Sequence, residues 1–219
     1  MQAAPVLTSV IDVDLPEWLL VPPTVTEEWR AAVRDVFDTV TRVERELPED
    51  GRLFEDGLVI DAEAAVEQLV RMAGDLEADD RLVASLVVPN RWPLPVIVSV
   101  GAADPDADLL DLAGATGGLP IDAPTVDELP PEVGGEGPVV TRFDLADDGA
   151  VMATVCCLRR ADGVDTRVLW RTNDLAVVPV FLPSLVELVG AVRNDVQAPI
   201  DAGTDANART DTDTDGASA

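Results

Sequence analysis

The chain has 219 residues, 47% of them hydrophobic, which is enough for one domain with a substantial core and excludes disorder throughout. It carries 42 acidic and 15 basic residues, for a formal net charge of −27. A field of this sign repels phosphates and anionic headgroups, so we expect neither nucleic acid nor a membrane as a partner.

The residue types that are missing exclude several kinds of chemistry. Every basic residue is Arg, and the chain has no Lys, His or Tyr. Without His there is no Ser-His-Asp or Cys-His catalysis and no imidazole metal ligand, and without Lys there is no Walker A lysine or Schiff base. We therefore predict no catalytic residue, no cofactor-binding residue and no cofactor. The acidity is typical of a halophilic or high-GC origin, and its alternative interpretation is a surface that recruits a basic partner.

The first third of the chain predicts a strand followed by two helices. A strand is expected over residues 6–13, and an extended apolar piece then runs to two prolines. The first helix begins at a cap that is either Thr24, in a capping box with Glu27, or Thr26. The second helix begins at the Asp61 cap and ends near Gly74.

A pair of strands with an exposed tip is predicted next. "RLVASLVVP" and "VIVSVG" are β-rich, and "NRWPLP" joins them as a hairpin or loop. Arg91, Trp92 and Leu94 at this tip are candidate protein-binding residues, because Trp and Arg dominate binding hot spots. The alternative is a Trp92 side chain that folds back over the sheet edge.

A short helix is expected over residues 106–113, and the segment 114–138 is dense in Gly and Pro. We predict an irregular excursion of unusual length, which is either mobile or functional. "GATGG" has the glycines of a phosphate-binding loop but lacks its Lys, so we interpret it as a loop.

Three strands then form a meander with Asp-Gly turns, over "VVTRFDL", "AVMATVCCLRR" and "TRVLWRT". Cys156 and Cys157 are neighbours on the middle strand, so their thiols point to opposite faces. A redox pair normally has C-x-x-C spacing at a helix start, and we predict buried, inert cysteines instead.

The apolar run 175–192 raises the question of a membrane span. Pro179 and Pro183 interrupt it, and a span needs about 20 apolar residues in sequence. We predict a strand over 175–182, which Pro179 moves towards a sheet edge, and a helix from the Ser184 and Glu187 capping box to Gln197.

The tail, residues 200–219, has no hydrophobic periodicity and is predicted to be a disordered acidic segment. Its "DTDTDG" matches the start of an EF-hand loop, with Asp211, Asp213 and Asp215 as candidate Ca²⁺ ligands. The bidentate Glu at the twelfth position and the flanking helices are missing, so we predict no metal site there.

The predicted fold is α+β: one mainly antiparallel sheet in a single domain, 1–199, covered by two N-terminal helices and a C-terminal helix. The stretch "TRVLWRTNDLAVVPVFLPSLVELVGAVRNDV" resembles the closing unit of the α/β sandwich in PsbP-like and LpqN-like proteins. The resemblance implies an accessory or binding protein without a shared catalytic constellation. The 114–138 excursion and the lack of a lipoprotein leader depart from that pattern.

The start of the chain has no positive region before Asp12, and two cysteines supply no disulfide framework, so we expect a soluble, cytoplasmic protein. The first functional hypothesis is a non-enzymatic accessory or protein-binding domain, with a partner of basic character among the options. The second is a carboxylate- and Mg²⁺-dependent enzyme, and the third is an assembly component that pairs through an edge strand. Nothing in the sequence sets the oligomeric state.

Overall fold

The computed structural model describes residues 6–13, 17–46, 61–88 and 93–197. The strands of this α+β structure are β1 Val6–Ile11, β2 Trp18–Leu20, β3 Asp80–Ser85, β4 Leu94–Ala102, β5 Thr125–Glu128, β6 Pro138–Leu145, β7 Val151–Ala161, β8 Val164–Thr172 and β9 Val192–Gln197. The α-helices are α1 Glu27–Glu46, α2 Ala62–Gly74, α3 Leu109–Leu112 and α4 Val178–Ala191, and the short 3-10 helices are η2 Pro131–Val133 and η3 Leu175–Val177.

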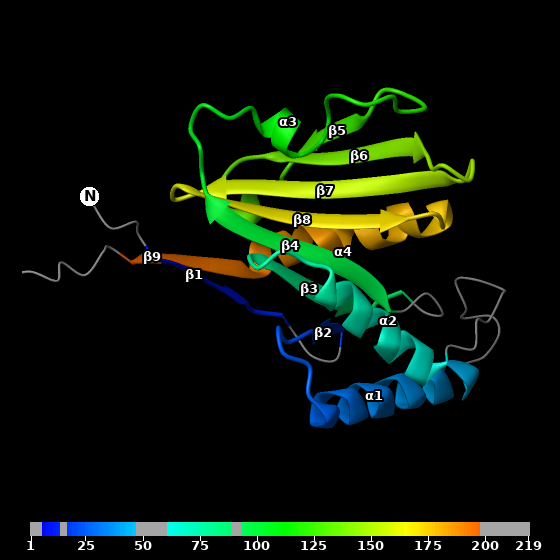
Figure 1. Cartoon of the computed structure of the whole chain (residues 1–219). Helices are drawn as coiled ribbons and strands as arrows, with labels where there is room; N and C mark the ends of the chain where they lie inside the picture. Colours follow the sequence, from blue (N-terminus) through cyan, green and yellow to red (C-terminus); the bar gives the residue numbers. More distant parts are fainter. Residues whose placement is uncertain (1–5, 14–16, 47–60, 89–92, 198–219) are drawn as a thin grey trace, which may run out of the picture.

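Seven strands form one antiparallel sheet in the order β2-β3-β4-β8-β7-β6-β5, and β1 pairs with β9 in a separate antiparallel ribbon (Figure 1). The predicted fold class, a mainly antiparallel sheet with two N-terminal helices and a C-terminal helix, is confirmed. The predicted meander is β6-β7-β8, and its last hairpin turns at Asp162 and Gly163.

The two faces of the large sheet are covered by different elements, because successive side chains on a strand point to opposite faces. On one face, the strand residues Val98, Val155 and Trp170 share a core with Phe181 and Leu185 of α4. Figure 1 shows α4 behind the sheet, with α1 and α2 at the β2-β3 end.

The opposite face has two smaller cores. At one end, Leu82 of β3 packs with Val66 and Leu69 of α2. At the other end, Ala113 after α3 packs with Val140 and Leu158 of β6 and β7. The α3 region is therefore a lid over the β6-β7 part of this face.

Phe181 is the centre of the main core. Its side chain is fully buried, and its ring lies 5.0 Å from that of Trp170 in an edge-on arrangement and 5.9 Å from that of Trp18. This contact joins the N-terminal β2, the central β8 and the C-terminal α4, which are far apart in the sequence.

The strand predicted over 175–182 was wrong, because that segment is η3 and the first turns of α4. Pro179 is the second residue of α4, where the backbone N–H has no intrahelical acceptor to lose. Pro183 lies inside the helix and removes one backbone hydrogen bond. Burial of Val178 and Phe181 in the core offsets this loss, so tertiary packing overrides the local β preference.

The C-terminal end of that helix was also predicted wrongly. The helix ends at Ala191, and Val192–Gln197 is β9, which pairs with β1 in a register that sets Ile11 opposite Val192. Pairing with a strand at the other end of the chain determines the extended backbone, and local periodicity carries no signal for such pairing.

The start predicted at the Ser184 and Glu187 capping box was wrong, because α4 begins at Val178 and Ser184 lies inside it. Two other helix starts follow the sequence closely. Thr26 is the cap of α1, because its Oγ1 accepts a hydrogen bond from Trp29 N at 3.2 Å. Asp61 caps α2, with Oδ1 accepting from Glu63 N at 3.0 Å and Ala64 N at 3.2 Å. Each cap satisfies N–H groups that the first helical turn leaves without partners.

Within the described residues, no helix combines the length and the apolar character that a membrane span requires. The domain boundary predicted at residue 199 and the acidic tail 200–219 lie outside the described residues.

Candidate functional site

The residues singled out from the sequence do not converge on a site. Arg91 and Trp92 lie outside the described residues, as do Asp211, Asp213 and Asp215. Leu94 is the first residue of β4, where it is only 8% exposed and belongs to the main core. It therefore offers no side chain for docking.

The two cysteines are buried and point to opposite faces of β7, as predicted. Cys157 belongs to the core beneath α4, whereas Cys156 belongs to the core beneath α3. Burial raises the pKa of Cys156 to about 11, and burial together with the neighbouring Cys156 raises that of Cys157 to about 12. Both thiols are therefore protonated at neutral pH, which makes them poor nucleophiles.

The segment 114–138 contains β5 and η2 between irregular stretches, and it follows directly on α3. The Asp108 carboxylate caps α3 by accepting a hydrogen bond from Leu110 N at 2.8 Å. At the other end, Ala115 N donates to Leu110 O and Gly114 N donates to Asp111 O, which are the two hydrogen bonds of a Schellman motif. Gly114 has φ +77°, the left-handed conformation that this motif requires. "GATGG" is thus a helix end.

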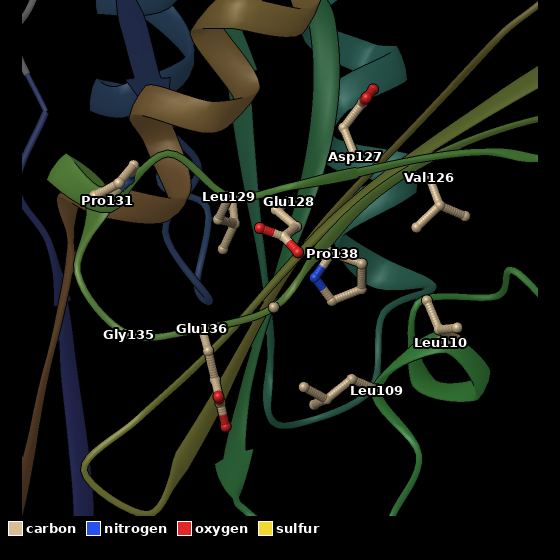
Figure 2. A pocket seen from close by; sticks show the side chains of 11 residues that line it. Leu109, Leu110, Val126, Asp127, Glu128, Leu129, Pro131, Gly135, Glu136 and Pro138 are labelled. Atoms are coloured by element: carbon tan, nitrogen blue, oxygen red, sulfur yellow. The ribbon is translucent and has the colours of Figure 1, made fainter.

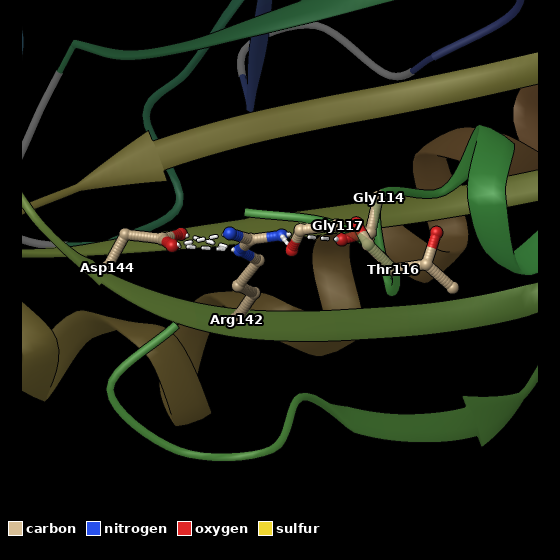
Figure 3. Close-up of polar contacts among 5 residues, drawn as sticks. All are labelled: Gly114, Thr116, Gly117, Arg142 and Asp144. Atoms are coloured by element: carbon tan, nitrogen blue, oxygen red, sulfur yellow. Dashed lines mark hydrogen bonds and ion pairs between the residues drawn. The ribbon is translucent and has the colours of Figure 1, made fainter. Parts of the chain in front are cut away.

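Arg142 of β6 holds the loop that follows α3 (Figure 3). Its Nη1 donates to the carbonyl oxygens of Gly114, Thr116 and Gly117, at 3.3, 3.4 and 2.9 Å. On its other side the guanidinium forms an ion pair with Asp144, with Nε 2.7 Å from Oδ2 and Nη2 2.6 Å from Oδ1. One side chain therefore fixes the loop to the sheet.

The end of the excursion lies directly against β7. Glu136 and Arg160 exchange two backbone hydrogen bonds of 3.0 and 2.7 Å. Gly137 has φ +149°, and a Cβ atom there would overlap the carbonyl group of Leu158. The excursion is thus fixed at both ends, and β5 between them becomes the last strand of the sheet.

These anchors leave a pocket of about 600 Å³ between α3, β5 and the segment after it (Figure 2). Its apolar lining residues are Leu109, Leu110, Val126, Leu129, Pro131 and Pro138, and its acidic lining residues are Asp127, Glu128 and Glu136. Figure 2 shows Leu110 and Val126 on the α3 and β5 sides of the pocket, and the Asp127 carboxylate directed away from it. We call this feature the β5 pocket.

Two of the exposed apolar side chains, Leu110 and Val126, line the β5 pocket, and others lie in the same stretch of the chain. Among the described residues, the large hydrophobic side chains exposed in this region are Leu110 at 39%, Leu112 at 38%, Leu119 at 93%, Ile121 at 48% and Val126 at 46%. These are five of eleven such side chains, within a short stretch of the chain. A concentration of this kind is typical of a binding surface.

The backbone of β5 also has free hydrogen-bonding groups. Leu129 N donates to Gly137 O at 3.0 Å, so by alternation the backbone groups of Thr125 and Asp127 point to β6. Those of Val126 and Glu128 point outward, where the described part of the sheet has no further strand. The pocket thus combines apolar contacts, negative charge and an open strand edge.

Within the described ranges, no group of three or more Cys, Asp or Glu residues is placed to hold a metal ion. Asp127 and Glu128 are successive residues on a strand, so their carboxylates diverge and do not form a catalytic pair.

Comparisons with family models, with curated proteins and with solved structures found no match to this chain. The resemblance to PsbP-like and LpqN-like proteins stays a prediction.

Proposed function

We propose that the protein is a non-enzymatic protein-binding domain, and that the β5 pocket binds a short extended segment of a partner protein. The observation that carries this proposal is the combination of apolar lining, acidic lining and open strand edge in one pocket.

The chemistry of the pocket defines the segment. Leu110 and Val126 are partly exposed, and burying an aliphatic side chain of this size contributes about 1.5–3 kcal/mol. The segment therefore presents apolar side chains to the pocket. Glu128 and Glu136 are exposed, and no Arg lines the pocket, so Arg or Lys residues flank those apolar side chains in the segment.

The strand edge defines the conformation of the segment. The outward N–H and C=O groups of Val126 and Glu128 are placed to pair with an added strand, a common mode of peptide recognition. Pro124 and Pro130 flank β5 and limit the pairing to these two residues. The paired stretch is therefore short, and the apolar contacts with α3 supply most of the affinity.

Selection from a library of random short peptides tests the proposal. We expect the selected peptides to combine basic and aliphatic residues and to bind the full chain with a measurable Kd. Leu110→Asp places a charge in the pocket and should abolish binding. Leu145→Asp is the matched control, because Leu145 is 65% exposed on β6 and does not line the pocket.

Selection of no peptide, or equal loss of binding in both variants, would contradict the proposal. If the chain instead self-associates through β5, light scattering will show a dimer that Leu110→Asp dissociates. That result would support the assembly hypothesis over the binding of a different partner.

A further inference from the structure

A second cavity lies where α4 ends and β9 begins, on the other side of the segment that closes the excursion. Its volume is about 560 Å³, and its lining includes Val133, Arg159, Val164, Asn194 and Val196. Cavities of this size hold small organic ligands in other proteins. This cavity is separate from the proposed peptide-binding function.

Two polar side chains of the cavity lining, Arg159 and Asn194, are tied to the interior of the sheet. Arg159 is 8% exposed and stands opposite the fully buried Thr166 on β7 and β8. Asn194 of β9 donates from Nδ2 to Thr166 Oγ1 at 2.8 Å. A buried guanidinium thus lies at the cavity.

Two atoms of these lining side chains have no hydrogen-bond partner among the described residues: Arg159 Nε and Asn194 Oδ1. Thr166 has one hydroxyl group, so in either orientation of the Asn194 amide one of its two ends stays without a partner. A buried polar atom without a partner costs about 1–3 kcal/mol. The two residues that carry these atoms, Arg159 and Asn194, both line the cavity.

The charge of Arg159 indicates the sign of that ligand. Its Nη2 donates to Val192 O at 2.6 Å and its Nη1 to Gly190 O at 3.5 Å, but no described carboxylate forms an ion pair with it. Burial accordingly lowers the pKa of Arg159, with a smaller opposing effect of Asp162. In a chain with a net charge of −27, a buried Arg without a carboxylate partner is a site for an external anion.

The rest of the cavity limits the size and charge of the anion. Val133, Val164, Val192 and Val196 form the aliphatic part of the wall, and the body of the ligand packs there. Arg193 also lines the cavity but forms an ion pair with Asp12, and the carboxylates of Asp162 and Asp195 in the lining disfavour a second negative charge on the ligand. A carboxylate fits these limits better than a phosphate dianion.

We propose that this cavity binds a monocarboxylate with an apolar body, whose carboxylate contacts Arg159 and whose chain packs on Val133, Val164 and Val196. Such a group occurs in free aliphatic acids and at the C-terminus of an apolar peptide.

Calorimetric titration of the full chain with hexanoate, and with an apolar peptide that has a free or an amidated C-terminus, tests the proposal. We expect saturable binding of hexanoate or of the free-acid peptide, which also identifies the source. Methyl hexanoate and the amidated peptide should not bind, and inorganic phosphate should bind at least about tenfold more weakly.

Two variants and a control test whether the ligand binds in this cavity. Arg159→Met removes the cation and should weaken binding by about tenfold or more. Val196→Trp should obstruct the cavity without touching Arg159, whereas Val10→Trp should have no effect, because Val10 is an exposed residue on the partner strand β1 outside the lining.

If Arg159→Met does not fold, the comparison of Val196→Trp with Val10→Trp still shows whether the ligand binds in this cavity. Absence of binding of both carboxylates, full binding by a folded Arg159→Met variant, equal effects of the two Trp variants, or preference for phosphate would overturn the proposal.

Discussion

Arg142 and Asp144, two residues apart on β6, form an ion pair in which Nη2 lies 2.6 Å from Oδ1 and the two side chains are 16% and 27% exposed. Both point to the same face of the strand, and the guanidinium also donates to carbonyl oxygens of the loop after α3. Asp144 orients Arg142, and Arg142 holds the excursion that forms the β5 pocket. A partly buried ion pair thus links the sheet to the candidate site.

Removal of the Arg142 guanidinium should loosen the excursion. Arg142→Met leaves Asp144 and several carbonyls without their donor, and we expect a loss of about 2 kcal/mol in the free energy of unfolding. Amide hydrogen exchange should accelerate over residues 114–121 and stay unchanged in β7. Arg71→Met is the control, because Arg71 is exposed on α2, and it should change stability by less than about 0.5 kcal/mol. Equal effects of the two variants would contradict this role of Arg142.

Asp144 predicts a pH dependence of stability. The hydrogen bonds from Arg142 lower the pKa of Asp144 below its ordinary value, and burial opposes this effect. The ion pair therefore stabilises the fold fully above the unfolded-state pKa of about 3.9, and this contribution is lost as the pH falls through the lower folded-state pKa. Denaturant unfolding of the wild type and Asp144→Asn should show a stability difference that is constant above about pH 5 and shrinks in acid. A difference that grows in acid would contradict the assignment.

The cysteines should be unreactive in the native protein. Burial raises the pKa of Cys156 to about 11 and that of Cys157 to about 12, so the thiolate is scarce at pH 8. We expect no reaction with a disulfide reagent such as DTNB at pH 8 under native conditions, and reaction of both thiols in denaturant. Rapid modification of one thiol in the folded protein would show that β7 is accessible.

Gly137 should tolerate no side chain. A Cβ atom there would overlap the Leu158 carbonyl group, whereas at Gly101 of β4 nothing lies within 4 Å of an added Cβ. Gly137→Ala should therefore lower the free energy of unfolding by about 2 kcal/mol or more and weaken peptide binding, and Gly101→Ala should be nearly neutral. Equal stability of the two variants would contradict the close contact of the excursion with β7.

Local signals in the sequence predicted much of the fold. The hydroxyl of Thr26, one of the two caps considered for the first helix, and the carboxylate of Asp61 start helices, and the Asp-Gly turn at 162–163 closes a hairpin. These features depend on neighbouring residues alone, so they can be predicted from the local sequence.

The wrong predictions concern segments whose conformation depends on contacts with residues far away in the sequence. β-branched residues favoured a strand over 175–182, which Pro179 was expected to move towards a sheet edge, but the contact of Phe181 with Trp18 and Trp170 makes this segment helical. The β5 pocket was missed for the same reason. Its excursion was noted for its length, but its shape depends on the reach of Arg142 to the Gly117 carbonyl and on contact of Gly137 with β7. Neither contact leaves a periodic pattern.

NMR mapping of the backbone amides, during titration with a peptide selected by the full chain, tests most directly whether the β5 pocket is the binding site. We expect the largest shift changes in α3 and β5, and new exchange protection for the outward amides of Val126 and Glu128. Shift changes confined to other elements, or unchanged exchange at these two amides together with unperturbed α3 signals, would contradict the assignment of the β5 pocket as the binding site.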